Sequence, residues 1–155
     1  MYKKQFHLIY VVTLAEYNLT IELHVKNTST PGVTGVPKEL EFQALLHNYI
    51  RAPSAQALVR PLNQLSYYDK TEATEEGRST AKVETRAAVD VRTYTDSVYE
   101  NASQKYDVRW ADDGITISST NFKDVVVWNP QENGRKMSDM EDNGWYVNLS
   151  PSFIS

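Results

Sequence analysis

The sequence predicts an all-β protein built as an antiparallel β-sandwich. Hydrophobic residues recur with a period of two over most of the chain, which is the pattern of strands with one buried face. Gly, Pro, Asn and Asp separate these short apolar runs, as expected for tight turns between antiparallel strands. Only one segment, residues 134–144, has the character of a helical turn. Regular short strands with turn residues between them indicate a sandwich.

The first two strands are expected to form a hairpin. Phe6 to Leu14 alternates between apolar and more polar residues, and the same alternation continues from Leu19 to Val25. The four-residue linker AEYN between them allows Leu14 to pair with Leu19. A loop rich in Ser, Thr, Pro and Gly follows at 27–39.

A third strand is expected at 39–49, where apolar residues at 40, 42, 44 and 46 share one face. The charged, glycine-containing stretch 70–82 is expected to be a solvent-exposed loop. Further short strands are expected at 65–70, 87–101, 106–110, 114–120 and 124–130. No linker, repeat or low-complexity tract divides the chain, so residues 1–155 are expected to form one domain.

Composition narrows the classes of function. The chain carries a formal net charge of −4 and has no cluster of Lys and Arg interleaved with aromatic residues. Nucleic acid is therefore not an expected partner. No apolar run is long enough to cross a membrane. The sequence contains no cysteine, which fits an intracellular protein, and we expect a cytoplasmic one.

Two of the three histidines fall on the polar face of the expected hairpin. If Leu14 pairs with Leu19, Ile9 lies opposite His24 and His7 is its diagonal neighbour. Two histidines so placed could bind a metal, but no third ligand accompanies them, and catalytic zinc normally has three protein ligands. A solvated sheet face is the favoured interpretation, and no metal or other cofactor is expected.

His47 has a different setting. It lies at the end of a strand, on the face opposite the apolar side chains, with Tyr49 on the same face. Sandwich scaffolds place ligand-binding side chains at strand ends and in the loops that follow. On this spacing alone, two interpretations stay open: a catalytic histidine or a structural one.

Several segments resemble the aldose-1-epimerase superfamily, also called the galactose mutarotase-like superfamily, in its hexose-6-phosphate mutarotase (glucose-6-phosphate 1-epimerase) branch. The segment LLHNYIRA at 45–52 is similar to the histidine motif of that branch, and DVVVWNP at 124–130 is similar to its tryptophan-asparagine-proline segment. LSYYDKT at 65–71 and TYTDSVYENA at 93–102 resemble the segments between them. The resemblance extends over nearly all of residues 5–145.

The resemblance implies a sandwich of the mutarotase type and a reaction that interconverts the α and β anomers of hexose 6-phosphates. His47 matches the family's general acid, Asp96 matches an aspartate that accepts hydrogen bonds from sugar hydroxyls, and Arg51 matches an arginine near the substrate. Family members are longer, and the chain resembles their C-terminal part. Their phosphate-binding arginines and the glutamate that acts as general base have no match here, so an incomplete sandwich is expected.

Two other functions stay open. One is a carbohydrate-binding or sugar-phosphate-binding module without catalysis. The other is an interaction protein that associates with itself or a partner through exposed sheet edges, as unpaired edge strands can do.

Overall fold

The computed structural model describes residues 5–29, 39–138 and 146–154. In these ranges nearly all of the regular secondary structure is antiparallel strand, which confirms the predicted fold class. The chain divides into two compact units, Met1–Phe42 and Gln43–Ser155, and each is described by itself below. The single domain over residues 1–155 stays a prediction. Among the described residues, no helix is long and apolar enough to cross a membrane.

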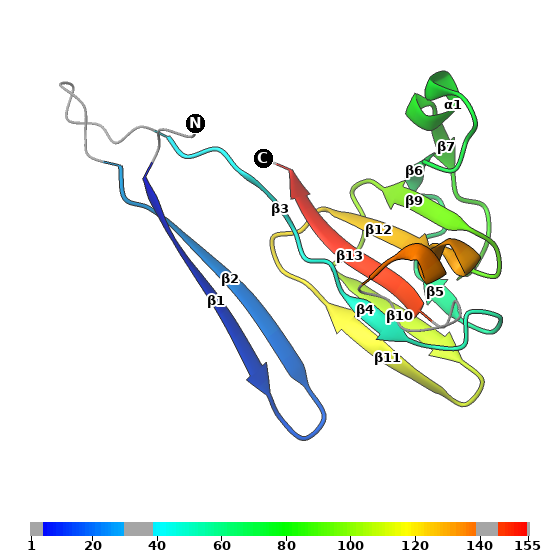
Figure 1. Cartoon of the computed structure of the whole chain (residues 1–155), viewed down its shortest axis with the longest axis horizontal. Helices are drawn as coiled ribbons and strands as arrows, with labels where there is room; N and C mark the ends of the chain where they lie inside the picture. Colours follow the sequence, from blue (N-terminus) through cyan, green and yellow to red (C-terminus); the bar gives the residue numbers. More distant parts are fainter. Residues whose placement is uncertain (1–4, 30–38, 139–145, 155) are drawn as a thin grey trace. The chain divides into compact units, whose positions relative to one another are not determined.

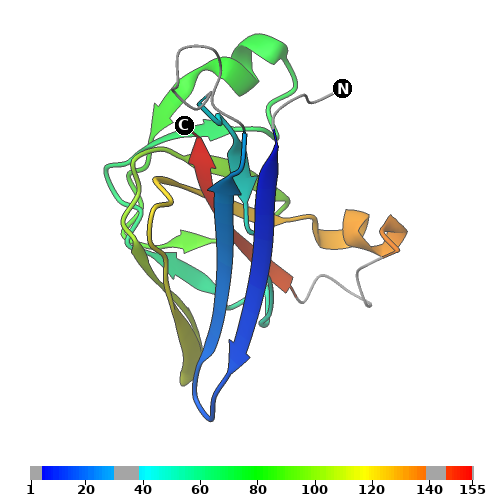
Figure 2. The ribbon, with the colours of Figure 1, turned by 90° about the vertical axis from the view of Figure 1, so that its left-hand side faces the viewer.

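The first unit contains a hairpin of β1 (Phe6–Leu14) and β2 (Leu19–Asn27), drawn side by side along their length in Figure 2. Leu14 is opposite Leu19 and Ile9 is opposite His24, which confirms the predicted register. The amide of Ala15 donates to the carbonyl of Asn18 at 2.8 Å and closes the turn. One face of the hairpin is apolar and carries Phe6, Leu8, Tyr10, Val12, Leu14, Leu19, Ile21, Leu23 and Val25.

The second unit contains two antiparallel sheets, drawn as two layers in Figure 1. The larger sheet has seven strands: β3 (Gln43–Leu45), β4 (Tyr49–Arg51), β13 (Tyr146–Ile154), β12 (Asp124–Asn129), β9 (Thr95–Tyr99), β6 (Ser66–Asp69) and β7 (Ala81–Val83). Both β3 and β4 pair with β13, and from β13 the sheet continues through β12, β9 and β6 to β7. The smaller sheet has the order β11 (Asp113–Ser118), β10 (Lys105–Trp110), β5 (Leu58–Arg60) and β8 (Val89–Asp90).

One hydrophobic core joins the two sheets. Side-chain burial alternates along β12. Val125 and Val127 are fully buried in this core, whereas Val126 and Trp128 are only partly buried. The same core contains buried residues of both sheets and their connections: Ile50, Ala52, Ala57, Val59, Leu62, Val89, Val91, Tyr99, Ala102, Tyr106 and Val108. The larger sheet therefore has an inner face on the core and an outer face turned away from it.

Three strands of the structure were not expected from the sequence. β5 and β7 are only three residues long, too short for a clear period of two. β13 has nine residues and lies inside the larger sheet, although its segment contains Asn148, Ser150 and Pro151. Proline normally argues against an interior strand because it lacks the N–H that a ladder needs.

The expected strand at 39–49 was wrong in extent, because the structure has β3 and β4 with a break at residues 46–48. The exposed loop at 70–82 was wrong in part, because it contains β7 and the short helix α1 (Glu75–Ser79). Thr74 caps this helix by accepting a hydrogen bond from the Gly77 amide at 3.0 Å. The expected helical turn at 134–144 begins earlier, as the 3-10 helix η1 (Gln131–Lys136), and its residues 139–144 lie outside the described residues.

Candidate functional site

His47 lies in the break between β3 and β4, opposite a proline-containing part of β13. Leu45 is paired with Ser152 and Tyr49 with Asn148, so the register is the same on both sides of the break. Residues 46–48 therefore face 149–151, a segment that includes Pro151. Because Pro151 has no N–H to donate, the ladder is weakened there. The Asn48 side chain donates to the carbonyl of Leu46 at 3.2 Å and fixes the local turn of the backbone.

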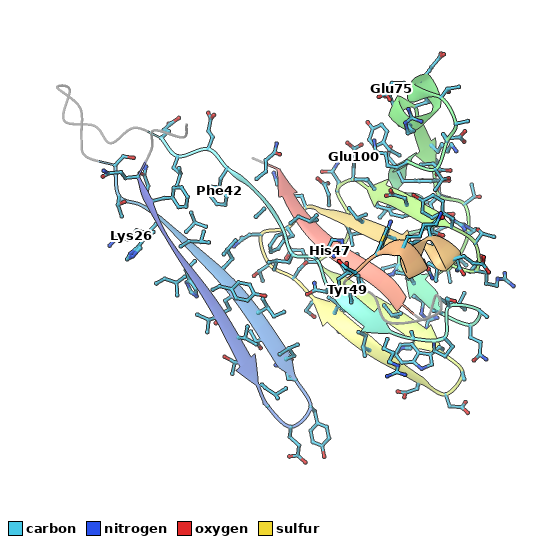
Figure 3. All side chains as sticks on the ribbon, in the orientation of Figure 1. Lys26, Phe42, His47, Tyr49, Glu75 and Glu100 are labelled. Atoms are coloured by element: carbon cyan, nitrogen blue, oxygen red, sulfur yellow. The ribbon has the colours of Figure 1, made fainter. Side chains whose placement is uncertain are left out.

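His47 belongs to a cluster of three aromatic side chains on the outer face of the larger sheet. Its ring centroid is 5.0 Å from that of Tyr49 and 6.0 Å from that of Trp128. The ring centroids of Tyr49 and Trp128 are 6.5 Å apart, and the rings meet edge to face. Figure 3 shows His47 and Tyr49 as neighbours where the chain enters β4. We call these three residues the aromatic cluster.

Asp96 lies on the same face as the aromatic cluster. Asp96 on β9 is directly opposite Trp128 on β12, and Trp128 is in turn opposite Asn148. Asn148 is opposite Tyr49, so one row across four strands runs from Asp96 to Tyr49. Residues directly opposite each other in an antiparallel ladder share a face. The sequence-predicted residues His47 and Asp96 therefore belong to one surface of the sheet.

The Asp96 carboxylate is half-buried. Burial raises its pKa above the ordinary value, and the nearby positive charge of Lys70 opposes that rise. Among the described residues, none donates a hydrogen bond to this carboxylate or forms an ion pair with it. Its oxygens are thus available as hydrogen-bond acceptors on the outer face.

Arg51 is at the end of β4, two residues after Tyr49, so it falls on the same face as Tyr49. Its side chain is exposed, and no described residue forms an ion pair with it. The structure therefore brings His47, Asp96 and Arg51 to one face of one sheet. His7 and His24 lie instead on the hairpin of the first unit. Among the described residues, no three His, Cys, Asp or Glu side chains gather in a way that could hold a metal ion.

A buried ionic network supports β9 from the inner face. Glu84, which is 2% exposed, accepts a hydrogen bond from the Tyr99 hydroxyl at 2.7 Å. It also accepts two from the Arg86 guanidinium, at 2.9 and 2.7 Å. Tyr99 stacks on Tyr67 with a centroid distance of 5.0 Å. The network joins β6, β9 and the segment after β7, and so fixes the strand that carries Asp96.

A second buried contact holds the end of β12, next to Trp128. The Asn129 side chain donates to the carbonyl of Val91 at 3.3 Å, and the Gln131 side chain donates to the same carbonyl at 2.6 Å. The side-chain Oδ1 of Asn129 accepts a hydrogen bond from the backbone N–H of Gln131 at 2.9 Å. Neither Asn129 nor Glu84 was singled out from the sequence. Asn129 follows Val125 and Val127 at an inward position of an alternating strand. A polar residue at such a position is the sequence signal that could have identified Asn129.

The comparisons with known proteins agree with this architecture. The family described as Aldose 1-epimerase matches residues 1–151. A crystal structure of YeaD from Salmonella typhimurium, described as a "putative mutarotase", matches 97% of this chain and 47% of its own, with a TM-score of 0.76 and 22% identity. The structure of HI1317 matches 96% of this chain and 58% of its own, with a TM-score of 0.62 and 14% identity.

The chain thus spans about half the length of the two solved structures. At these identities the likeness to them shows a shared fold. No curated protein sequence matches the chain.

Proposed function

Because the chain belongs to the aldose 1-epimerase family, we propose that it binds a hexose on the outer face of the larger sheet and interconverts its α and β anomers. The observation that carries this proposal is the row that joins Asp96, Trp128 and Tyr49, with His47 beside Tyr49. This row and His47 together place a half-buried carboxylate, two aromatic rings and an imidazole on one surface. Carboxylates accept hydrogen bonds from hydroxyl groups, and aromatic rings offer an apolar surface to the carbon-bound hydrogens of a sugar.

The distances suit a single sugar ring. The backbones of β9 and β4 are separated by three strand spacings, roughly 14 Å. Side chains from both strands shorten this gap, and hydrogen bonds of about 2.8 Å bridge the remainder. One hexose can therefore be held by Asp96 at one end while its anomeric carbon lies near His47.

His47 is the proposed general acid. Mutarotation breaks the bond between C1 and the ring oxygen, while the ring oxygen gains a proton and the anomeric hydroxyl loses one. Rotation about the bond between C1 and C2, followed by ring closure, then gives the other anomer. Imidazole exchanges protons near neutral pH, so it can protonate the ring oxygen and take the proton back on closure. His47 gives its proton to the ring oxygen, and water accepts the proton that the anomeric hydroxyl loses.

The proposed substrates are hexose 6-phosphates, with glucose 6-phosphate as the first to test. Arg51 supports this choice because its exposed guanidinium lies on the same face as Tyr49. A guanidinium can form two parallel hydrogen bonds to a phosphate. A cytoplasmic location is part of the same proposal.

The test measures the rate of anomer exchange of glucose and of glucose 6-phosphate by two-dimensional exchange NMR. We expect exchange above the buffer background with the unchanged chain and a loss of about 10²–10⁴-fold with His47→Ala, the usual contribution of a general acid. His24→Ala is the matched control and should leave the rate unchanged. Binding of the sugar without excess exchange would refute the enzyme and favour a non-catalytic carbohydrate-binding module.

A second candidate function is self-association, which the apolar face of the hairpin favours. Leu14 is 81% exposed, and Leu8, Tyr10, Val12 and Leu19 are each more than half exposed. A two-stranded hairpin is marginally stable by itself and gains stability when its apolar face is covered. The edge strand β11 is another surface for pairing. Analytical ultracentrifugation decides this candidate: a concentration-dependent dimer that Leu8→Lys abolishes supports it, and a monomer at all concentrations rejects it.

A further inference from the structure

The ladder between β12 and β9 ends one pair beyond the row of the candidate site. Its last pair is Asn129 with Thr95. The pair before it is Trp128 with Asp96, which belongs to the row. End pairs of a strand ladder open most readily, because they have a neighbouring pair on one side only. The contacts that keep the last pair closed therefore also hold the two strands together where they carry Trp128 and Asp96.

Three hydrogen bonds hold this end of the ladder, and we call their residues, Val91, Asn129 and Gln131, the carbonyl clamp. The carbonyl oxygen of Val91 accepts one bond from the Asn129 side chain at 3.3 Å and another from the Gln131 side chain at 2.6 Å. The third bond joins Asn129 and Gln131, from the backbone N–H of Gln131 to Oδ1 of Asn129 at 2.9 Å. Val91 lies in the segment between β8 and β9. The clamp thus ties the end of β12 to the segment that leads into β9.

The carbonyl clamp is buried, and its backbone is constrained. Val91 and Asn129 are both 0% exposed, so their polar groups depend on partners within the protein. Gln131 has a φ of 50°, in the left-handed region that residues with a Cβ seldom adopt. Such a conformation persists only where surrounding contacts determine it. At Gln131 these contacts are the bond from its backbone N–H and the bond from its side chain.

Trp128 is the side chain of the candidate site that lies nearest to the clamp along the chain. It directly precedes Asn129, and its ring centroid is 6.0 Å from that of His47. Trp128 is only partly buried on the outer face, so the core does not enclose its ring. The backbone of β12 therefore sets where the ring begins, and the clamp holds the end of that strand.

We propose that Asn129 and Gln131 are positioning residues for the candidate site. By binding the Val91 carbonyl, they keep the last pairs of the ladder closed and so keep Trp128 beside His47. Their role in the ladder does not depend on what the protein binds. Their role toward a sugar rests on the proposed function, and the experiments below separate the two.

The first measurement follows the contact between the Trp128 and His47 rings by NMR, without any ligand. In the unchanged chain, a nuclear Overhauser effect is expected between the two rings. Gln131→Ala removes one of the two bonds to the Val91 carbonyl and should weaken this effect. It should also shift the His47 ring signals toward those of Trp128→Ala, in which the neighbouring ring is absent.

Asn63→Ala is the matched control. The Asn63 side chain also donates one hydrogen bond to a backbone carbonyl, that of Arg86 at 3.1 Å, and this bond lies outside the ladder between β12 and β9. The variant loses a bond of the same kind and should leave both rings in place. An equal change in Asn63→Ala would overturn the proposal, since the effect would then follow from a general loss of stability.

Gln131→Glu is a second variant that keeps the length of the side chain but replaces its N–H donor with an acceptor. It should shift the His47 signals as Gln131→Ala does, while the amide spectrum of the smaller sheet stays unchanged. If either variant is folded and its contact between Trp128 and His47 is that of the unchanged chain, the proposal fails.

The second measurement is the affinity for glucose by calorimetry. The apparent affinity falls in proportion to the fraction of molecules whose ladder end is closed. A closed fraction of about 10–30% in Gln131→Ala therefore predicts a loss of about three- to tenfold, whereas Asn63→Ala should bind as the unchanged chain does. A Gln131→Ala variant that loses the ring contact but binds glucose equally well would refute the role toward the sugar. If the unchanged chain binds no glucose, the proposed function fails, while the ligand-free measurement still decides the role of the clamp.

Discussion

The buried Glu84 carboxylate offers the most quantitative prediction, for the variant Glu84→Gln. Burial by itself would raise the pKa of Glu84, but hydrogen bonds from the Arg86 guanidinium, the Arg86 amide and the Tyr99 hydroxyl outweigh it. They hold the pKa at about 2, against an ordinary value of 4.5. A depression of this size corresponds to about 3 kcal/mol of folding free energy.

The sign of the pH dependence follows from the direction of the shift. A carboxyl whose pKa is lower in the folded chain stabilises it fully above the unfolded pKa, near 4.5. This contribution is lost as the pH falls from there toward 2. The unchanged chain should therefore be about 3 kcal/mol more stable than Glu84→Gln at pH 7, and the difference should approach zero near pH 2.

Urea denaturation of both chains at a series of pH values measures this difference. Glu16→Gln, at an exposed position in the turn of the hairpin, is the matched control and should leave the stability nearly unchanged at every pH. A difference between Glu84→Gln and the unchanged chain that stays constant from pH 7 to pH 2 would refute the reasoning. So would a variant as stable as the unchanged chain at pH 7.

Two further predictions concern the core and the aromatic cluster. Leu62→Ala, at a position 1% exposed, should cost about 2–5 kcal/mol of unfolding free energy, because it leaves a cavity in the core. Leu58→Ala, at a position 42% exposed, should cost less than half as much in the same denaturation experiment, and equal losses would contradict the assigned core. Tyr49→Ala should weaken sugar binding about two- to tenfold in calorimetry, the range expected for one aromatic contact. Tyr17→Ala, at a position 93% exposed on the hairpin turn, should not weaken it, and an equal loss would move the sugar site away from β4.

The sequence was sufficient for the fold class and for the hairpin because both depend on local alternation. The pairing of Leu14 with Leu19 followed from a four-residue linker and two apolar runs, and the structure has that register. The face on which His47 and Tyr49 lie also followed from a period of two. That Asp96 and His47 share one face could not be derived from periodicity, because β9 and β4 do not pair with each other and are related only through β12 and β13.

The central position of β13 was the least predictable feature of the fold. Pro151 and the polar residues around it indicate an edge strand or a loop when the segment is considered alone. In the structure, the strand is paired on both sides, and the ladder to β3 and β4 is interrupted opposite the segment with Pro151. The interruption coincides with His47. The break at the candidate site therefore lies opposite the segment with Pro151, an arrangement that only the pairing of distant strands reveals.

The charged network of Glu84 was missed for a related reason. Glu84 and Arg86 lie in a stretch whose composition suits a solvent-exposed segment. Glu84 is buried because Tyr99 and Arg86 satisfy its oxygens, and its partner Tyr99 is fifteen residues away. Burial of a carboxylate depends on such partners, which a single sequence does not specify.

The most direct test of the account is to follow the ring signals of the three histidines by NMR while glucose 6-phosphate is added at constant pH. His47→Ala, His7→Ala and His24→Ala assign the three signals. We expect the His47 signals to move and saturate with the sugar, while those of His7 and His24 on the hairpin stay in place. Signals of His47 that remain unchanged at saturating sugar would contradict a sugar site on this face.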